Sequence, residues 1–187
     1  MRFFSATPDS PSTLEKLFEG FQFATRCDAW MAAIVTGWIK TASDFCPHQD
    51  EPFRPPLVLI SGPRGCGKKT LALRMAEYGA ETGAYILRQL YECPIESGEL
   101  SIVAAERAPA VLFDCSGPLH DPLTLEGWLL ADKWPVRVMG QETASQIPLA
   151  TVSMLTTESA KLPPELEGLA VHIRLLSRET SSVGVKP

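Results

Sequence analysis

One ten-residue segment restricts the fold of this chain more than any other feature. It spans residues 61–70 and reads SGPRGCGKKT, with three glycines and two adjacent lysines. Four consecutive apolar residues, LVLI at 57–60, precede it. A short apolar run without alternation is typical of a strand covered on both faces, as in a parallel sheet. Residues 68–78 show a helical pattern. We therefore expect a strand, a tight turn and a helix in direct succession.

Strand and helix patterns alternate along the rest of the chain. Strands are predicted at 84–87, 110–113, 136–139, 151–155 and 171–175, and helices at 26–42, 95–107 and 123–131. This alternation predicts an α/β fold with a mainly parallel sheet. We expect an N-terminal helical lead-in and linker over 1–56, a core over 57–176 and a polar tail over 177–187. In the lead-in helix, the predicted apolar stripe consists of Trp30, Ala33, Ile34 and Trp38.

Charge and composition exclude some classes of protein. The chain has 187 residues and a net charge of −5, which argues against coating nucleic acid or an anionic membrane by charge alone. No apolar run reaches about 18 residues, so we expect no membrane partner. The five cysteines are odd in number and widely spaced, and the N-terminus lacks a signal-peptide core. We therefore expect free thiols and a cytoplasmic protein.

The glycine-rich segment fits the phosphate-binding pattern G-x-x-x-x-G-K. Glycines allow the backbone N–H groups of such a loop to turn toward a phosphate, and the following helix points its positive end at the same place. The lysine of the pattern reaches the β- and γ-phosphates. The predicted nucleotide-binding residues are Gly62, Pro63, Arg64, Gly65, Cys66, Gly67, Lys68, Lys69 and Thr70. The alternative is a glycine-rich turn without a ligand.

One position departs from this pattern. The residue after the lysine is normally Ser or Thr, whose hydroxyl ligates Mg²⁺, whereas here it is Lys69. An ammonium group has donors but no lone pair for a metal, so the use of Mg²⁺ is in doubt. One hypothesis is that Lys69 or Arg64 supplies the positive charge that Mg²⁺ would bring. The other is that Lys69 points to solvent.

A second candidate site residue ends the apolar strand predicted at 110–113. Asp114 stands where phosphate-loop ATPases hold Mg²⁺, and it is our candidate metal-binding residue. Cys115 follows it, and a thiol is a poor general base unless its pKa is shifted. The alternative reading of Asp114 is a cap or turn residue.

Three stretches together resemble a known family: FDCSGPL at 113–119, WPVRVMG at 134–140 and the approach from Phe21 to Trp38. The chain is similar, over about 17–175, to the AAA+ or superfamily 3-type ATPase domain of primase–helicase proteins from phages, plasmids and integrated elements. This resemblance implies a three-layer αβα P-loop NTPase that binds ATP or ADP. It also implies homo- or hetero-oligomers with AAA+ subunits and DNA contact through the assembly.

The departures from the family pattern fall on catalytic positions: Lys69, Cys115, Glu158 with Ser159, and Gly168 with Leu169. The last pair stands where the family has arginines that act on a neighbouring subunit's ATP, and such arginines are worth about 10³–10⁵ in rate. Arg137 matches another family arginine. Asp114, Arg137 and Glu158, which replaces the family's residue at a catalytic position, are the candidate catalytic residues.

These departures favour a nucleotide-binding domain with weak or no ATP hydrolysis, acting in DNA replication as a ring subunit or accessory. The first alternative is an active helicase or ATPase motor with an unusual site, supported by Lys68, Asp114 and Arg137. The second alternative is an adaptor or inhibitor that binds no nucleotide and mimics a helicase subunit.

Overall fold

The computed structural model describes residues 16–45, 53–80, 85–89, 97–115, 122–137, 143–158 and 161–177. Helices and strands alternate along it, as the patterns predict, except that three strands follow one another between residues 133 and 157. In chain order the elements are α2 (Arg26–Ser43), β1 (Leu57–Ser61), α3 (Lys68–Ala80), β2 (Tyr85–Gln89), α4 (Ser97–Ala105), β3 (Ala110–Cys115), α5 (Pro122–Leu130), β4 (Lys133–Val136), β5 (Ser145–Pro148), β6 (Val152–Thr157), α6 (Pro164–Glu167) and β7 (Ala170–Arg174).

Five strands form one sheet in the order β2-β3-β6-β1-β7, and every neighbouring pair is parallel. The strand before the glycine-rich segment, β1, therefore lies inside the sheet between β6 and β7. Only β6 separates it from β3, the strand that carries Asp114. Because the strands are parallel, the residues that follow β1, β3 and β6 all lie at one edge, which we call the carboxyl edge.

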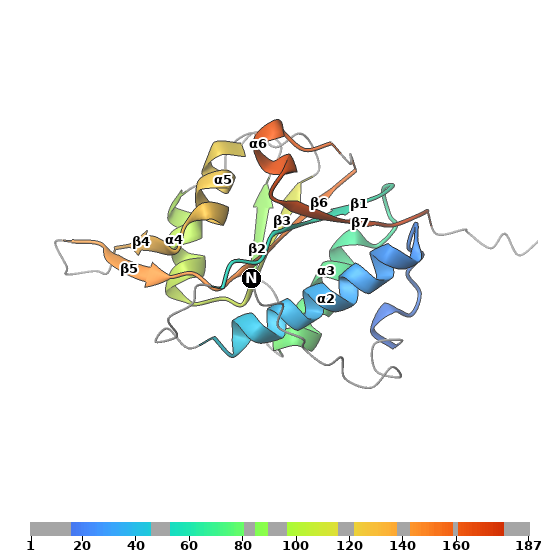
Figure 1. The fold of residues 1–187 in the computed structure, drawn as a ribbon, viewed down its shortest axis with the longest axis horizontal. Helices are drawn as coiled ribbons and strands as arrows, with labels where there is room; N and C mark the ends of the chain where they lie inside the picture. Colours follow the sequence, from blue (N-terminus) through green and yellow to red (C-terminus); the bar gives the residue numbers. More distant parts are fainter. Residues whose placement is uncertain are drawn as a thin grey trace, which may run out of the picture.

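Helices cover both faces of this sheet (Figure 1). One face lies against α2 and α3, and the other against α4, α5 and α6. The strand side chains alternate accordingly: Val58 and Ile60 join the first core, whereas Leu57 and Leu59 join the second. This three-layer arrangement around a parallel sheet confirms the predicted fold class.

The lead-in helix α2 buries a different face from the one that the sequence pattern indicates. Its buried residues are Asp28, Ala32, Val35, Thr36, Ile39 and Ala42. In the predicted stripe, Trp30 is 69% exposed, and Trp38 only borders the core. The physical reason is the close approach of α2 to α3, where Ile39 and Thr36 lie directly against Gly79. Medium-sized side chains fit this contact, and indole rings do not.

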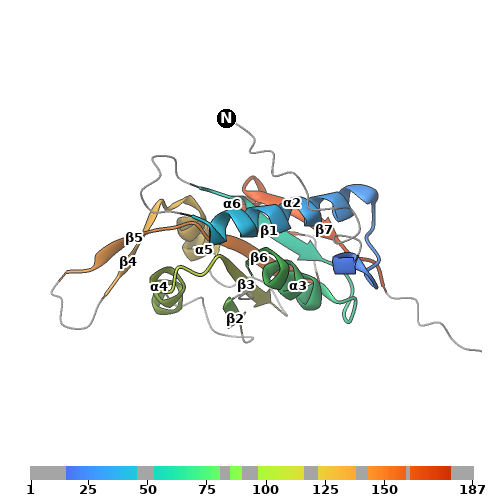
Figure 2. The same cartoon turned by 90° about the horizontal axis from the view of Figure 1, so that it is seen from below.

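The strands β4 and β5 pair antiparallel as a separate ribbon (Figures 1 and 2). The strand predicted at 136–139 begins earlier, at Lys133, and residues 138–142 lie outside the described part of the chain. Residues 145–148 form β5, for which the sequence patterns predict no strand. The ribbon pairs Trp134 with Ile147, and both side chains contact the core on the α5 face.

Some predicted segments extend beyond the residues that the structure describes. The polar tail beyond residue 177, the first 15 residues of the lead-in and Ser159 lie outside them. The short helix α6 was not predicted, because its four residues are too few for a helical period to show. Within the described ranges, no helix has both the length and the apolar character needed to cross a membrane.

Candidate functional site

The glycine-rich segment forms a turn between the carboxyl end of β1 and the start of α3, where a phosphate loop requires it. Gly65 and Gly67 have φ angles of 79° and 95°, which other residues rarely adopt. At Gly62, a Cβ atom would lie 2.5 Å from the carbonyl oxygen of Leu175. The glycines are therefore required by backbone geometry, which explains their spacing.

The loop leads into the first turn of α3, whose N–H groups have no acceptor within the helix and point toward the loop. Cys66 is buried beneath the loop, in the core that α2 and α3 share. Its N–H donates to the carbonyl oxygen of Pro63 at 3.3 Å, so this N–H maintains the turn. Pro63, Arg64 and Thr70 are exposed.

Lys68 bends back over the loop. Its ammonium donates hydrogen bonds to the carbonyl oxygens of Gly62 at 2.7 Å and Pro63 at 2.9 Å. These acceptors lie at the start of the loop, so the positive charge is held against the loop backbone. A phosphate that entered the loop would meet a lysine already positioned over it.

Lys69 contacts Asp114 across the site. The Lys69 ammonium lies 2.9 Å from one carboxylate oxygen of Asp114, and the Thr156 hydroxyl donates to the other oxygen at 2.8 Å. The Lys69 and Asp114 side chains are 36% and 32% exposed, so the pair lies at the mouth of the loop. Of the two hypotheses for Lys69, the structure favours the one in which its charge belongs to the site.

The register of the sheet explains this cluster. Asp114 pairs with Thr156 across β3 and β6, so both side chains project from the same face of the sheet. That face carries α3, the helix of Lys69. The residue pattern therefore places a cation, a carboxylate and a hydroxyl at one point. Thr156 is a functional candidate outside the set predicted from the sequence.

Cys115 projects to the opposite face of the sheet and is buried in the core beside α4 and α5. Burial, together with the negative charge of Asp114, raises the pKa of its thiol to about 12. The thiol is therefore protonated at neutral pH and cannot accept a proton from an attacking water molecule. The sequence-based expectation of a poor base agrees with this geometry.

The remaining candidates lie in two places. Glu158 directly follows β6 at the carboxyl edge, and because Thr157 pairs with Ser61 it lies beside the start of the loop. Arg137 is exposed and follows β4 at the end of the ribbon farther from the sheet, where Val136 pairs with Ser145. Glu158 therefore follows β6 next to the start of the loop, whereas Arg137 follows β4, whose ribbon with β5 lies apart from the start of α3 (Figure 1).

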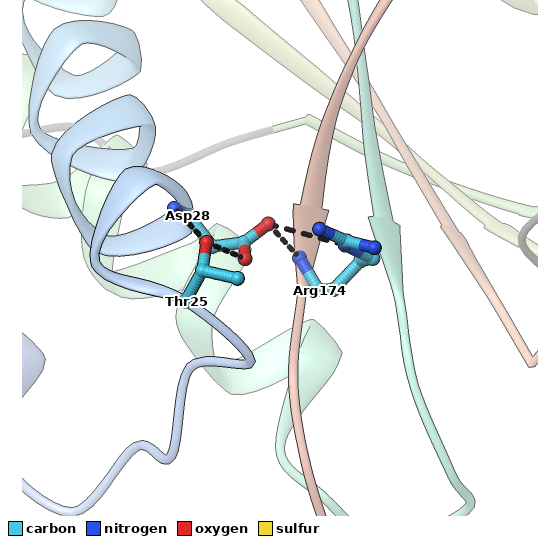
Figure 3. A network of polar contacts seen from close by, with 3 residues as sticks. All are labelled: Thr25, Asp28 and Arg174. Carbon is cyan, nitrogen blue, oxygen red and sulfur yellow. Dashed lines mark hydrogen bonds and ion pairs between the residues drawn. The ribbon is translucent and has the colours of Figure 1, made fainter.

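The residue that follows β7 contacts the start of the loop. The N–H of this residue, Leu175, donates to the carbonyl oxygen of Ser61 at 2.9 Å. Behind it, the buried Asp28 of α2 accepts hydrogen bonds from the backbone N–H of Arg174 and from the Thr25 hydroxyl (Figure 3). The lead-in helix is thereby fixed to the strand that contacts Gly62.

Neither a family model nor a curated protein sequence matches the chain. Solved structures do share its fold. The apo structure of the C-terminal region of NrS-1 aligns over 89% of this chain and 38% of that chain, with a TM-score of 0.53 and 9% identity. At this identity the similarity concerns the fold alone.

Two other structures align less closely. The X-ray structure of JCV helicase aligns with a TM-score of 0.49 and 18% identity, over 89% of this chain and 50% of that chain. PCH-2 from C. elegans aligns with a TM-score of 0.49 and 12% identity, over 87% of this chain and 45% of that chain. The chain thus spans about half of the JCV helicase chain.

Proposed function

We propose that this chain is a P-loop nucleotide-binding domain, related to the ATPase domains of mobile-element replicative helicases, that hydrolyses ATP weakly or not at all. The observation that carries the proposal is the loop between β1 and α3, with Lys68 held over it and Lys69 beside it. The Lys68 ammonium contacts the loop backbone, the Lys69 ammonium contacts the neighbouring Asp114, and helix α3 begins at the loop's end. This arrangement suits the phosphates of ATP or ADP.

Weak hydrolysis follows from the groups around this loop. Hydrolysis needs a polar group that positions water, and the residue after Asp114 is a buried, protonated thiol. Gly168 and Leu169 stand where the resemblance implies arginines. Glu158 reaches the loop edge, but its negative charge is unfavourable beside a γ-phosphate. Binding is therefore supported better than turnover.

The cellular role rests on the family resemblance. We propose that the domain acts in DNA replication in the cytoplasm, as a ring subunit or an accessory beside AAA+ subunits. In such an assembly, Arg137 at the end of the ribbon would have to act on a neighbouring subunit, because it lies away from this chain's own loop. DNA contact would come from the assembly, since the chain itself is acidic.

Thermal melting with ATP and with ADP tests nucleotide binding. A ligand at about 100 times its dissociation constant should add roughly 2.7 kcal/mol to the free energy of unfolding. Lys68→Ala should weaken binding by about tenfold or more, because a charge-assisted phosphate contact is lost. Lys133→Ala, on an exposed residue of β4, is the matched control and should bind like the native chain.

The alternatives predict other outcomes. Turnover of about 1 s⁻¹ or faster, with or without single-stranded DNA and lost in Lys68→Ala, would identify an active motor. The absence of any melting shift with either nucleotide would favour an adaptor that binds none.

A further inference from the structure

Mg²⁺ is the cation that P-loop proteins use, and the donor set of this chain does not fit it. The metal is held by the hydroxyl after the loop lysine and by the strand-end carboxylate. Here the first position is Lys69, which offers no lone pair. The second is Asp114, whose two oxygens accept hydrogen bonds from Lys69 and Thr156.

What occupies the metal position is an ammonium group. Lys69 is the first residue after the loop lysine, and its Nζ reaches the strand-end carboxylate at 2.9 Å. An ion pair this exposed adds little to the free energy of folding, about 1 kcal/mol or less. The pair matters because of its position: it fixes the Lys69 ammonium between α3 and β3, next to the loop that fits the phosphate-binding pattern.

We propose that Lys69 takes the place of Mg²⁺, so that this loop binds the phosphates of ATP or ADP without a metal ion. The proposal rests on the proposed function, since it concerns the same loop. Asp114 then acts as a positioning residue that holds the Lys69 ammonium through its carboxylate. Thr156 fixes the rotamer of that carboxylate from the neighbouring strand.

Two features make Lys69 the cation instead of Arg64. Arg64 is exposed at the tip of the turn, and among the described residues no ion pair holds its side chain. Lys69 is held in place by Asp114. A fixed cation loses less conformational freedom on binding than a mobile one, so it contributes more to affinity.

The contact between Lys69 and Asp114 also predicts how added Mg²⁺ changes the affinity for nucleotide. Mg²⁺ would have to displace the Lys69 ammonium from Asp114, and a nucleotide already bound to Mg²⁺ carries less negative charge toward the two lysines. We therefore expect the native chain to bind ATP and ADP in the presence of a chelator at least as tightly as in the presence of Mg²⁺.

Isothermal titration calorimetry of the full chain with ATP and ADP, in chelator and in Mg²⁺, tests this. Lys69→Thr supplies the missing hydroxyl and removes the ammonium group from Asp114. In this variant, the affinity measured in chelator should fall about tenfold, and Mg²⁺ should restore it. Lys69→Arg keeps the charge and should bind in chelator within about threefold of the native chain.

The controls separate this proposal from the proposed function. Lys133→Thr makes the same substitution on β4, away from the loop, and should leave both affinities unchanged. Circular dichroism melting establishes that each variant is folded.

Three outcomes would count against these proposals. If the native chain binds nucleotide about tenfold or more tightly with Mg²⁺ than with chelator, the metal-free proposal is overturned and nucleotide binding stays intact. Unchanged binding of Lys69→Thr in chelator would overturn it as well. Absence of binding in both conditions would overturn both proposals.

Discussion

Asp28 shows how one buried carboxylate joins the lead-in to the sheet. Its side chain is 4% exposed, accepts from the Thr25 hydroxyl at 2.6 Å and from the Arg174 N–H at 2.9 Å, and lies 3.6 Å from the Arg174 guanidinium (Figure 3). Burial pushes the pKa of this carboxyl up, but the hydrogen bonds from Thr25 and Arg174 and the charge of Arg174 outweigh it. The pKa is therefore lowered, and the folded state favours the ionised form.

We predict that Asp28→Asn lowers the free energy of unfolding by about 1.5–3 kcal/mol at neutral pH, because it removes the charge from these hydrogen bonds. A lowered folded-state pKa contributes stability above the unfolded-state pKa of about 3.9, and that contribution disappears as the pH falls through the folded-state pKa. Urea unfolding at several pH values should therefore show the gap between native chain and variant closing below about pH 4. A gap that is independent of pH would contradict this account.

The sequence shows which residues at the loop carry chemistry, but it does not show how they pair. The glycine spacing predicts the turn, and the apolar strand before Asp114 predicts a carboxylate at the same edge. The partner of Lys69 depends on the rotation of α3 over the sheet and on which strands are neighbours. Both are set by packing between residues far apart in the chain, so the sequence alone does not distinguish a solvent-facing Lys69 from a site-facing one.

At the scale of elements, the predictions succeed where a strand is buried on both faces. The runs at 57–60 and 110–113 lie within β1 and β3, because a continuous apolar stretch has one stable environment in this fold. The face of α2 was predicted incorrectly, since its sequence offers two apolar stripes. Large tryptophans suggested one stripe, and close packing against α3 selects the other.

This close packing gives a test of the α2–α3 contact. At Gly79 of α3, a Cβ atom would lie 2.8 Å from Cβ of Ile39 and 2.9 Å from the carbonyl oxygen of Thr36. We predict that Gly79→Ala is destabilising, because overpacking costs about 1–3 kcal/mol and outweighs a gain of at most about 1 kcal/mol in helix propensity. Guanidinium chloride unfolding measures the change.

Gly127, in the middle of α5, is the matched control. A Cβ atom there would meet nothing within 4 Å, so Gly127→Ala keeps the propensity gain without the steric cost. It should raise the free energy of unfolding by up to about 1 kcal/mol. If both variants were stabilising, the helices would be farther apart than they are in this structure.

At the scale of the whole molecule, the lead-in contributes to the same core as the sheet. Buried residues of α2 belong to one apolar cluster with strand residues from β1, β3, β6 and β7 and with α3. The lead-in also contacts the loop-supporting strand through Asp28. The predicted boundary between lead-in and core at residue 57 therefore does not coincide with a gap in the packing.

We predict that a chain that begins at residue 53, and so lacks α2, does not fold cooperatively. Fully burying a side chain such as Val35 or Ile39 contributes about 1.5–3 kcal/mol, and deletion also exposes their partners on β1 and α3. Together these losses approach the total stability of a typical domain, about 5–15 kcal/mol. Ile39→Ala in the full chain should cost only about 2–5 kcal/mol and keep a cooperative transition. Circular dichroism melting measures the cooperativity of unfolding, and titration with ATP measures binding. A sharp transition and native-like ATP binding in the shortened chain would contradict the prediction. They would mean that the lead-in is an independent unit and that the loop needs only the sheet and α3 to hold its shape.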